Sequence, residues 1–185
     1  MIEIITGRLH LRPVSIDDKD SMYSYRADLE TNKYLSLIPK SVEDVAEFIG
    51  KTSVEVDVPG TWYQLVIIEK DSGVLIGDIG IHFLDNSQVE IGYTLDKQFR
   101  GKGYGTEALR KVIDYLVNNL NKHRIVASID PTNEKSIRLI ERLGFSKEAH
   151  FVESLFFQGK WVDELVYAIL AREWNNGGER VLNFN

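Results

Sequence analysis

The sequence predicts a single domain of the α/β (α+β) class, with about seven strands and about four helices. Runs with strand and helix periodicity follow one another in the order strand, helix, helix, three strands, helix, strand, helix, two strands. The chain has 185 residues, of which 43% are hydrophobic, and no linker, repeat or low-complexity run divides it. One core is therefore expected over residues 1–174, with residues 175–185 as a C-terminal tail.

The N-terminal part predicts one strand and two helices. The run from Arg8 to Pro13 alternates apolar and polar residues, as a half-buried strand does. Ser15 with Asp18 marks a helix start, and Ser41 with Asp44 repeats the same signal before a run of apolar residues.

Three strands then form a meander. The strand-rich runs Thr61 to Glu69 and Val74 to Leu84 are separated by a turn at residues 70–73. A second turn at residues 85–87 leads into the strand Val89 to Leu95.

The second half alternates helices and strands. An amphipathic helix is expected from near Thr106, a strand from Arg124 to Ile129, and a short helix from about Asn133 to Leu143. Two strands, at residues 146–157 and 161–170, are joined by a hairpin turn at residues 158–160. One face of the first of these helices is apolar, through Ala108, Leu109, Val112, Leu116 and Leu120.

A glycine-rich turn between the third meander strand and the amphipathic helix is the most informative feature. It reads Gln98-Phe-Arg-Gly-Lys-Gly-Tyr-Gly-Thr106. Glycines at alternate positions leave main-chain N–H groups accessible to an anion at the positive end of a helix. The turn lacks the G-x-G-x-x-G spacing of dinucleotide folds, and the chain has no G-x-x-x-x-G-K-[ST] run. The turn therefore predicts a phosphate site of another kind.

The stretch Gln98-Phe-Arg-Gly-Lys-Gly103 fits Q/R-x-x-G-x-G/A and resembles the pyrophosphate-binding motif of the GNAT superfamily of coenzyme A-dependent N-acetyltransferases. The order of segments is similar to the GNAT fold over nearly the whole chain, which implies a central mixed, mostly antiparallel sheet. Four stretches most resemble the RimJ/RimL-like branch: residues 6–12, the Trp62 strand, residues 101–108 and residues 133–136.

The resemblance implies acetyl-CoA as the cofactor and places its contacts. Main-chain N–H groups from Phe99 through Gly105 would hold the pyrophosphate, and the pantetheine arm would lie along residues 93–95. The N–H of Thr94 or Tyr93 would polarise the thioester carbonyl. The full set of implied cofactor contacts is Tyr93, Thr94, Leu95, Gln98, Phe99, Arg100, Gly101, Lys102, Gly103, Tyr104, Gly105, Thr106, Asn133 and Ser136.

The implied chemistry is direct acetyl transfer to an amine, which must lose a proton before it can attack. Glu90, at the start of the strand before the glycine turn, is the first candidate for the base. Glu153, Asp130 and His82 remain alternatives. Ser136 is the implied proton donor to the departing thiolate, whereas Asn133 is also explained as a helix cap.

Three positions depart from the relatives that the family suggests. Ile140 stands where many GNAT enzymes carry a tyrosine acid, in Leu139-Ile-Glu-Arg-Leu-Gly-Phe145. Ser128 and Leu155 stand where RimI-like and RimL-like enzymes carry a carboxylate. The resemblance therefore implies a fold and a cofactor, and it leaves the acceptor open.

Composition narrows the possible locations and partners of the protein. The chain has no cysteine, no leader at Met1 and no apolar run long enough to cross a bilayer, so we expect a cytoplasmic protein without disulfides. A net charge of −6 argues against a nucleic-acid partner and suits a cationic amine. We expect an amine acceptor, either a protein N-terminus or a small molecule, no metal and no membrane partner, and a monomer or homodimer. The alternatives are an acyl-CoA-binding module with little turnover and a nucleotide-binding regulator.

Overall fold

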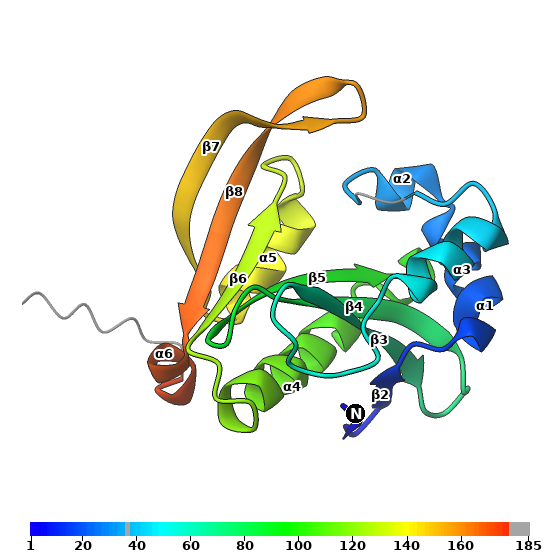
Figure 1. The fold of residues 1–185 in the computed structure, drawn as a ribbon, viewed down its shortest axis with the longest axis horizontal. Helices are drawn as coiled ribbons and strands as arrows, with labels where there is room; N and C mark the ends of the chain where they lie inside the picture. Colours follow the sequence, from blue (N-terminus) through cyan, green and yellow to red (C-terminus); the bar gives the residue numbers. More distant parts are fainter. Residues whose placement is uncertain (36–37, 178–185) are drawn as a thin grey trace, which may run out of the picture.

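The computed structural model describes residues 1–35 and 38–177, and it confirms the expected α/β class, with a mixed, mostly antiparallel sheet. Its strands form one eight-stranded sheet in the order β1-β2-β3-β4-β5-β6-β8-β7. Figure 1 shows α4 below the sheet and the β7–β8 hairpin extending above it. A short helix, α6 (Ala171–Asn175), ends at the first residue of the predicted tail, and residues 178–185 lie outside the described residues.

The N-terminal half follows the sequence signals and adds two short elements. The additions are the two-residue strand β1 (Ile4–Ile5) and the one-turn helix α2 (Leu29–Asn32), which are too short to show a periodic pattern. The other elements are β2 (Leu9–Pro13), a 3₁₀ turn η1 (Ile16–Asp18), α1 (Lys19–Arg26) and α3 (Val42–Gly50). The Asp44 N–H donates to Ser41 Oγ at 3.3 Å, which confirms the predicted start of α3.

The meander is antiparallel throughout. It comprises β3 (Thr61–Glu69), β4 (Leu75–Phe83) and β5 (Gln88–Leu95), close to the predicted ranges. Its register places Trp62 beside His82 and His82 beside Glu90, so these three side chains lie in one row across the sheet.

The second half contains α4 (Tyr104–Asn118), β6 (Arg124–Ile129) and α5 (Glu134–Arg142). Helix α4 begins at Tyr104, earlier than the expected Thr106, because Gly103 takes a left-handed conformation and serves as the N-cap. The hairpin strands are β7 (Ser146–Phe157) and β8 (Lys160–Leu170). Gln158 and Gly159 have φ of +48° and +82°, as a two-residue hairpin turn requires.

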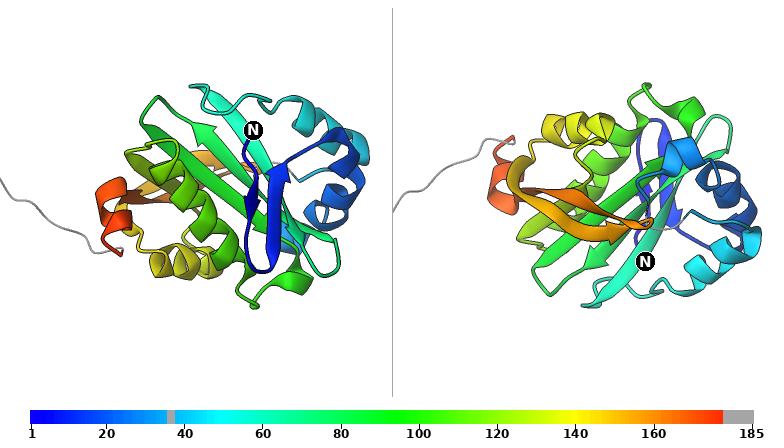
Figure 2. Two further views of the ribbon diagram at one scale, coloured as in Figure 1. Left: turned by 90° about the horizontal axis from the view of Figure 1, so that it is seen from below. Right: turned by 90° about the horizontal axis from the view of Figure 1, so that it is seen from above.

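The two faces of the sheet are covered differently. Helix α4 lies across one face, over the main core, as seen from below in Figure 2. Helices α1 and α3 cover only part of the other face, where Met22, Val45 and Val66 form a second, smaller core. A buried ion pair between Arg26 of α1 and Asp78 of β4 anchors these helices to the sheet.

The sheet opens between β5 and β6, its only parallel pair in the described chain. Pairing runs from Gln88 with Arg124 to Glu90 with Val126 and then stops, although β5 continues to Leu95. Beyond Glu90 the two strands diverge, because β6 stays paired with β8 through Ile129. The edge of β5 after Glu90 is therefore unpaired on that side.

Candidate active site

The glycine turn presents a row of unused main-chain donors. Gly101 and Gly103 have φ of +75° and +83°, a region that favours glycine. Gly103 caps α4 without a side-chain hydrogen bond. Within the described part of the chain, no acceptor is bonded to the N–H groups of residues 101–106. This arrangement is typical of an anion site at a helix start.

The predicted row of donors began earlier, at Phe99. Its N–H donates to the Asp96 carbonyl at 2.9 Å, and the Arg100 N–H donates to the Lys97 carbonyl at 3.4 Å. The Gln98 N–H is likewise held by Asp96 Oδ1 at 3.0 Å. The donors that remain for a ligand start at Gly101 and extend through Thr106.

The three glycines of the turn have different surroundings. A Cβ on Gly101 would meet no atom within 4 Å, and a Cβ on Gly103 would meet only Arg8 Nη2 at 3.4 Å. Both positions therefore open onto unfilled space. A Cβ on Gly105 would instead lie 3.1 Å from Leu139 Cδ1, so Gly105 allows α4 to pack closely against α5.

The charged side chains of the turn point in different directions. The Arg100 Nε donates to the Leu95 carbonyl at 2.8 Å, so this guanidinium fixes the end of β5. Burial lowers its pKa. The Lys102 ammonium lies 5.3 Å from the Phe99 ring, on the exposed side of the turn.

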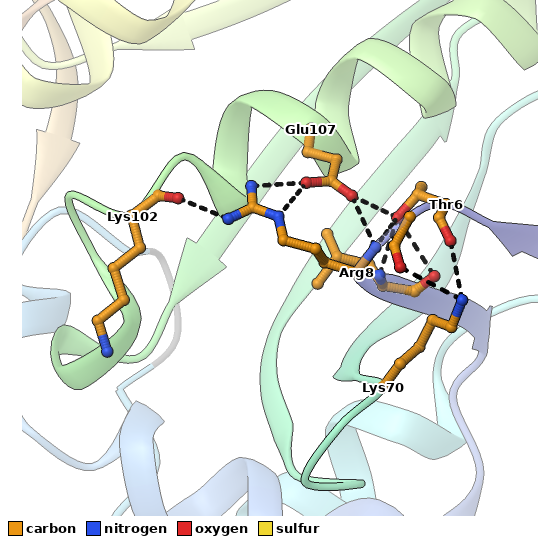
Figure 3. A network of polar contacts seen from close by, with 7 residues as sticks. Thr6, Arg8, Lys70, Lys102 and Glu107 are labelled. Carbon is orange, nitrogen blue, oxygen red and sulfur yellow. Dashed lines mark hydrogen bonds and ion pairs between the residues drawn. The ribbon is translucent and has the colours of Figure 1, made fainter.

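Arg8, which motif reasoning did not assign to the site, braces the turn from the N-terminal segment (Figure 3). Its Nη1 donates to the Lys102 carbonyl at 2.9 Å and its Nε donates to Glu107 Oε2 at 2.7 Å. Its guanidinium also lies 4.4 Å from the centre of the Tyr104 ring. Thr6 Oγ1 donates to Glu107 Oε1 at 2.5 Å, so the segment before β2 and the first turn of α4 hold each other.

The main-chain groups on the unpaired edge of β5 face a gap, which is the space between β6 and the part of β5 that follows Glu90. The Asp96 N–H donates to the Ile76 carbonyl, so it points toward β4. Counting back along β5 from Asp96, successive N–H groups point alternately away from β4 and toward it. By this alternation Thr94 directs its N–H at β4, whereas Tyr93 and Leu95 direct theirs at the gap. Of the two predicted donors to a thioester carbonyl, the register therefore favours Tyr93.

Helix α5 begins beside the gap and carries the second predicted element. Asn133 Oδ1 accepts the Ser136 N–H at 3.3 Å, so Asn133 serves as the N-cap. The Ser136 hydroxyl lies 2.6 Å from the Tyr93 hydroxyl. Burial raises the pKa of Tyr93 to about 12. Ile140, which replaces the family's tyrosine, is fully buried in the core.

Glu90 lies on the opposite face of the sheet from the Tyr93–Ser136 pair, because side chains alternate along β5. Its Oε2 lies 3.8 Å from His82 Nδ1. The His82 ring is stacked on Trp62, with centroids 4.6 Å apart. Gly92, the next residue on this face of β5, has open space above it. Glu90 and Ser136 thus approach the gap from two sides.

Glu164 of β8 is a candidate site residue that the sequence analysis did not single out. Burial and the nearby Glu90 carboxylate raise its pKa. It also lines a hollow of about 320 Å³ between the end of β6 and the β7–β8 hairpin, together with Tyr34, Ser128, Asp130 and the hairpin residues Leu155 and Phe156. Only the strand order β5-β6-β8 brings Glu164 near Glu90, and no local motif marks it.

The weaker base candidates are placed less favourably. Asp130 Oδ1 accepts the Thr132 N–H and hydroxyl, at 2.7 and 2.6 Å, and so stabilises the turn before α5. Glu153 lies on the exposed hairpin with φ of +45°. Its N–H donates to Asp163 Oδ1 at 2.9 Å. Glu90, at the last β5–β6 pair, and Glu164, whose pKa the Glu90 carboxylate raises, therefore remain the candidate carboxylates.

Among residues 1–35 and 38–177, no helix is long and apolar enough to cross a bilayer. In the same residues, no group of three or more His, Asp or Glu side chains is arranged to hold a metal ion.

Comparisons with family models, protein sequences and solved structures all find acetyltransferases. A family model for the acetyltransferase (GNAT) domain matches residues 8–146. The uncharacterized N-acetyltransferase p20 of Bacillus licheniformis is 33% identical over 94% of this chain and 99% of that protein. The ribosomal protein uS5-alanine N-acetyltransferase of Escherichia coli is 36% identical over 47% of this chain and 45% of that protein. A crystal structure of a GNAT-family acetyltransferase from Bacillus anthracis has a TM-score of 0.84 at 27% identity, covering 93% of this chain and all of that one.

Proposed function

We propose that this chain, which belongs to the GNAT family of acetyltransferases, uses acetyl-CoA to acetylate a primary amine by direct transfer. The observation that carries this proposal is the row of free main-chain donors at residues 101–106, beside a strand whose edge is unpaired after Glu90. A diphosphate needs several donors at a positive helix end, and an amide-bearing arm needs an open strand edge. The unpaired edge of β5 ends at Leu95, and the chain then leads into the donors of the glycine turn.

Acetyl-CoA supplies an acyl group activated as a thioester, and the chain's own residues do the remaining work. The N–H groups of residues 101–106 hold the diphosphate, and the edge of β5 aligns the arm. The Tyr93 N–H, directed at the gap, stabilises negative charge as it develops on the carbonyl oxygen. Ser136, on the α5 side of the gap, is placed to meet the sulfur as the carbon–sulfur bond breaks.

The acceptor amine enters from the opposite face, where Glu90 and Glu164 lie. An ammonium group must lose a proton before its nitrogen can attack the acyl carbon. We propose Glu90 as the group that accepts this proton, directly or through one water. Glu164 shares the site, and its raised pKa suits proton exchange nearer to neutral pH.

The acceptor is proposed as an amine at a protein N-terminus or on a small molecule. Carboxylates on the acceptor face favour a cationic substrate. The Escherichia coli relative named above is, as its name states, an alanine N-acetyltransferase that acts on ribosomal protein uS5. A cytoplasmic location and a monomeric or dimeric state remain predictions, to be tested by cell fractionation and by light scattering.

The experiment measures coenzyme A binding and thiol release separately. Calorimetry with coenzyme A and acetyl-CoA tests the site at residues 101–106. Thiol release from acetyl-CoA is then followed across peptides with different N-terminal residues, polyamines and aminoglycosides. Amine-dependent release supports the proposed function, whereas the absence of binding to either form of coenzyme A contradicts it.

One observation favours a second candidate, an acyl-CoA-binding module with little turnover. The tyrosine that many relatives use as an acid is Ile140 here, and this side chain is buried in the core. Tight coenzyme A binding without thiol release on any amine would support this candidate over the enzyme.

A further inference from the structure

The hydroxyl of Tyr93 reaches α5 from a strand that borders the gap. Its oxygen lies 2.6 Å from Ser136 Oγ and 3.3 Å from the Ser136 carbonyl oxygen. The shorter contact has the length of a strong hydroxyl–hydroxyl hydrogen bond. The Tyr93 and Ser136 hydroxyls therefore meet beside the gap in which we place the thioester, on the face of the sheet opposite Glu90.

Either hydroxyl can donate in this contact, and we consider the arrangement in which the phenol is the donor. Burial raises its pKa to about 12, so the phenol keeps its proton at neutral pH. A phenol that donates to Ser136 Oγ leaves the serine's own hydrogen unused. Among the described residues, Ser136 Oγ has no other hydrogen-bond partner than Tyr93. The serine hydrogen is then available to a group in the gap.

We propose that Tyr93 is a positioning residue, which donates to Ser136 Oγ and so directs the Ser136 hydroxyl hydrogen at the sulfur of coenzyme A. This inference rests on the proposed function and adds Tyr93 as a residue that orients the Ser136 hydroxyl. As the carbon–sulfur bond breaks, its electron pair goes to sulfur, while the amine nitrogen forms the new bond to the acyl carbon. Ser136 donates a hydrogen bond to the sulfur, and Tyr93 donates one to Ser136. The sulfur then takes up its proton from water.

The same contact has a purely structural reading, in which Tyr93 only fastens α5 to β5. The chain offers a matched control for that reading. Tyr167 of β8 also donates from its hydroxyl to α5, to Glu141 Oε1 at 3.1 Å, without touching Ser136. Tyr167→Phe therefore removes a strand-to-α5 hydrogen bond of similar kind and leaves the proposed pair intact.

The first test measures the pKa of the bound coenzyme A thiol, from the ultraviolet absorbance of its thiolate during a pH titration. We expect a lowered thiol pKa in the wild type, and a rise by about one unit in both Tyr93→Phe and Ser136→Ala. Tyr167→Phe should leave it unchanged. This measurement needs binding and no turnover, so it tests the inference even if no amine is acetylated.

The second test uses a double-mutant cycle on kcat at saturating acetyl-CoA, with an acceptor that the wild type uses. Tyr93→Phe should lower kcat about tenfold when Ser136 is present, and should have no further effect in Ser136→Ala.

The outcomes separate the two proposals. An active wild type in which Tyr93→Phe changes neither the thiol pKa nor kcat overturns the role of Tyr93 and leaves the proposed function standing. Independent, multiplicative effects of the two substitutions on kcat also overturn it. A Tyr93-dependent thiol pKa in a chain that acetylates no amine supports this inference and rejects the enzymatic function. A chain that binds no coenzyme A overturns both.

Discussion

Replacing Gly103 with valine tests the glycine turn as the phosphate site. Gly103 has φ of +83° and caps α4, and a Cβ there meets only Arg8 Nη2 within 4 Å. The backbone can keep its conformation, at a cost of about 1–2 kcal/mol for a branched residue with positive φ. For a chain of this size, that cost lowers the melting temperature by about 2–8 °C. The fold therefore survives the substitution.

The effect on coenzyme A binding should be much larger than the effect on folding. A Cβ on Gly103 meets only Arg8 Nη2 within 4 Å, so we expect the valine methyl groups to occupy space that the diphosphate needs beside the N–H groups of residues 101–106. Loss of only two charge-assisted hydrogen bonds, at about 1.5 kcal/mol each, removes about 3 kcal/mol of binding free energy. The dissociation constant of coenzyme A should then rise about a hundredfold.

Gly159→Val supplies the matched control. Gly159 has φ of +82° and open surroundings, but it lies in the β7–β8 turn, far along the chain from the glycine turn. We expect a similar loss of melting temperature by circular dichroism and an unchanged dissociation constant by calorimetry. A folded Gly103→Val that binds coenzyme A as tightly as the wild type would contradict the role of the glycine turn, and so would an equal loss of affinity in Gly159→Val.

Three further predictions concern proton transfer and stability. Glu90→Gln should lower kcat most at neutral pH and less in alkali, where more of the amine is already neutral, and an unaltered pH–rate profile would remove Glu90 as the base. Arg26→Met leaves the fully buried Asp78 without its cation. Chemical denaturation should show a loss of about 3–5 kcal/mol in the free energy of unfolding, and a loss near zero would contradict a stabilising pair. Burial raises the pKa of Glu107, but hydrogen bonds from Thr6 and Arg8 outweigh this effect, so the net pKa lies below its usual value. Its carboxylate therefore stabilises the fold above its unfolded pKa, and this stability is lost as pH falls through the folded pKa. Glu107→Gln should flatten the decline of the melting temperature below about pH 5, and an unchanged pH dependence would contradict this role.

Local signals in the sequence predicted most of the elements correctly. The Ser41 and Asp44 pair marks the start of α3 because the capping hydrogen bonds join residues three apart. The turn after β7 was found because hairpin turns require residues that accept positive φ, and Gln158-Gly159 provides them. Short elements such as α2 and β1 were not found, since one turn or two residues show no period.

Contacts between distant segments explain what the sequence could not give. Arg8 joins Glu107 across 99 positions, and no periodicity connects them. Glu164 comes near Glu90 only because β8 pairs with β6, which pairs with β5. Tyr93 was predicted for its main chain alone, and its hydroxyl reaches Ser136 only because α5 packs beside β5.

The sequence by itself determined the class of the domain, the order of its segments and the glycine turn that starts α4, because caps, turns and periodicity depend on neighbouring residues. The tertiary structure decided how the ends of β5 and β6 separate, which N–H groups stay free, and which side chains meet across the gap. These depend on strand order and register, and a register shift of a single residue moves every side chain to the other face of the sheet. The chemistry of this site therefore follows from pairing between segments that are far apart in the chain.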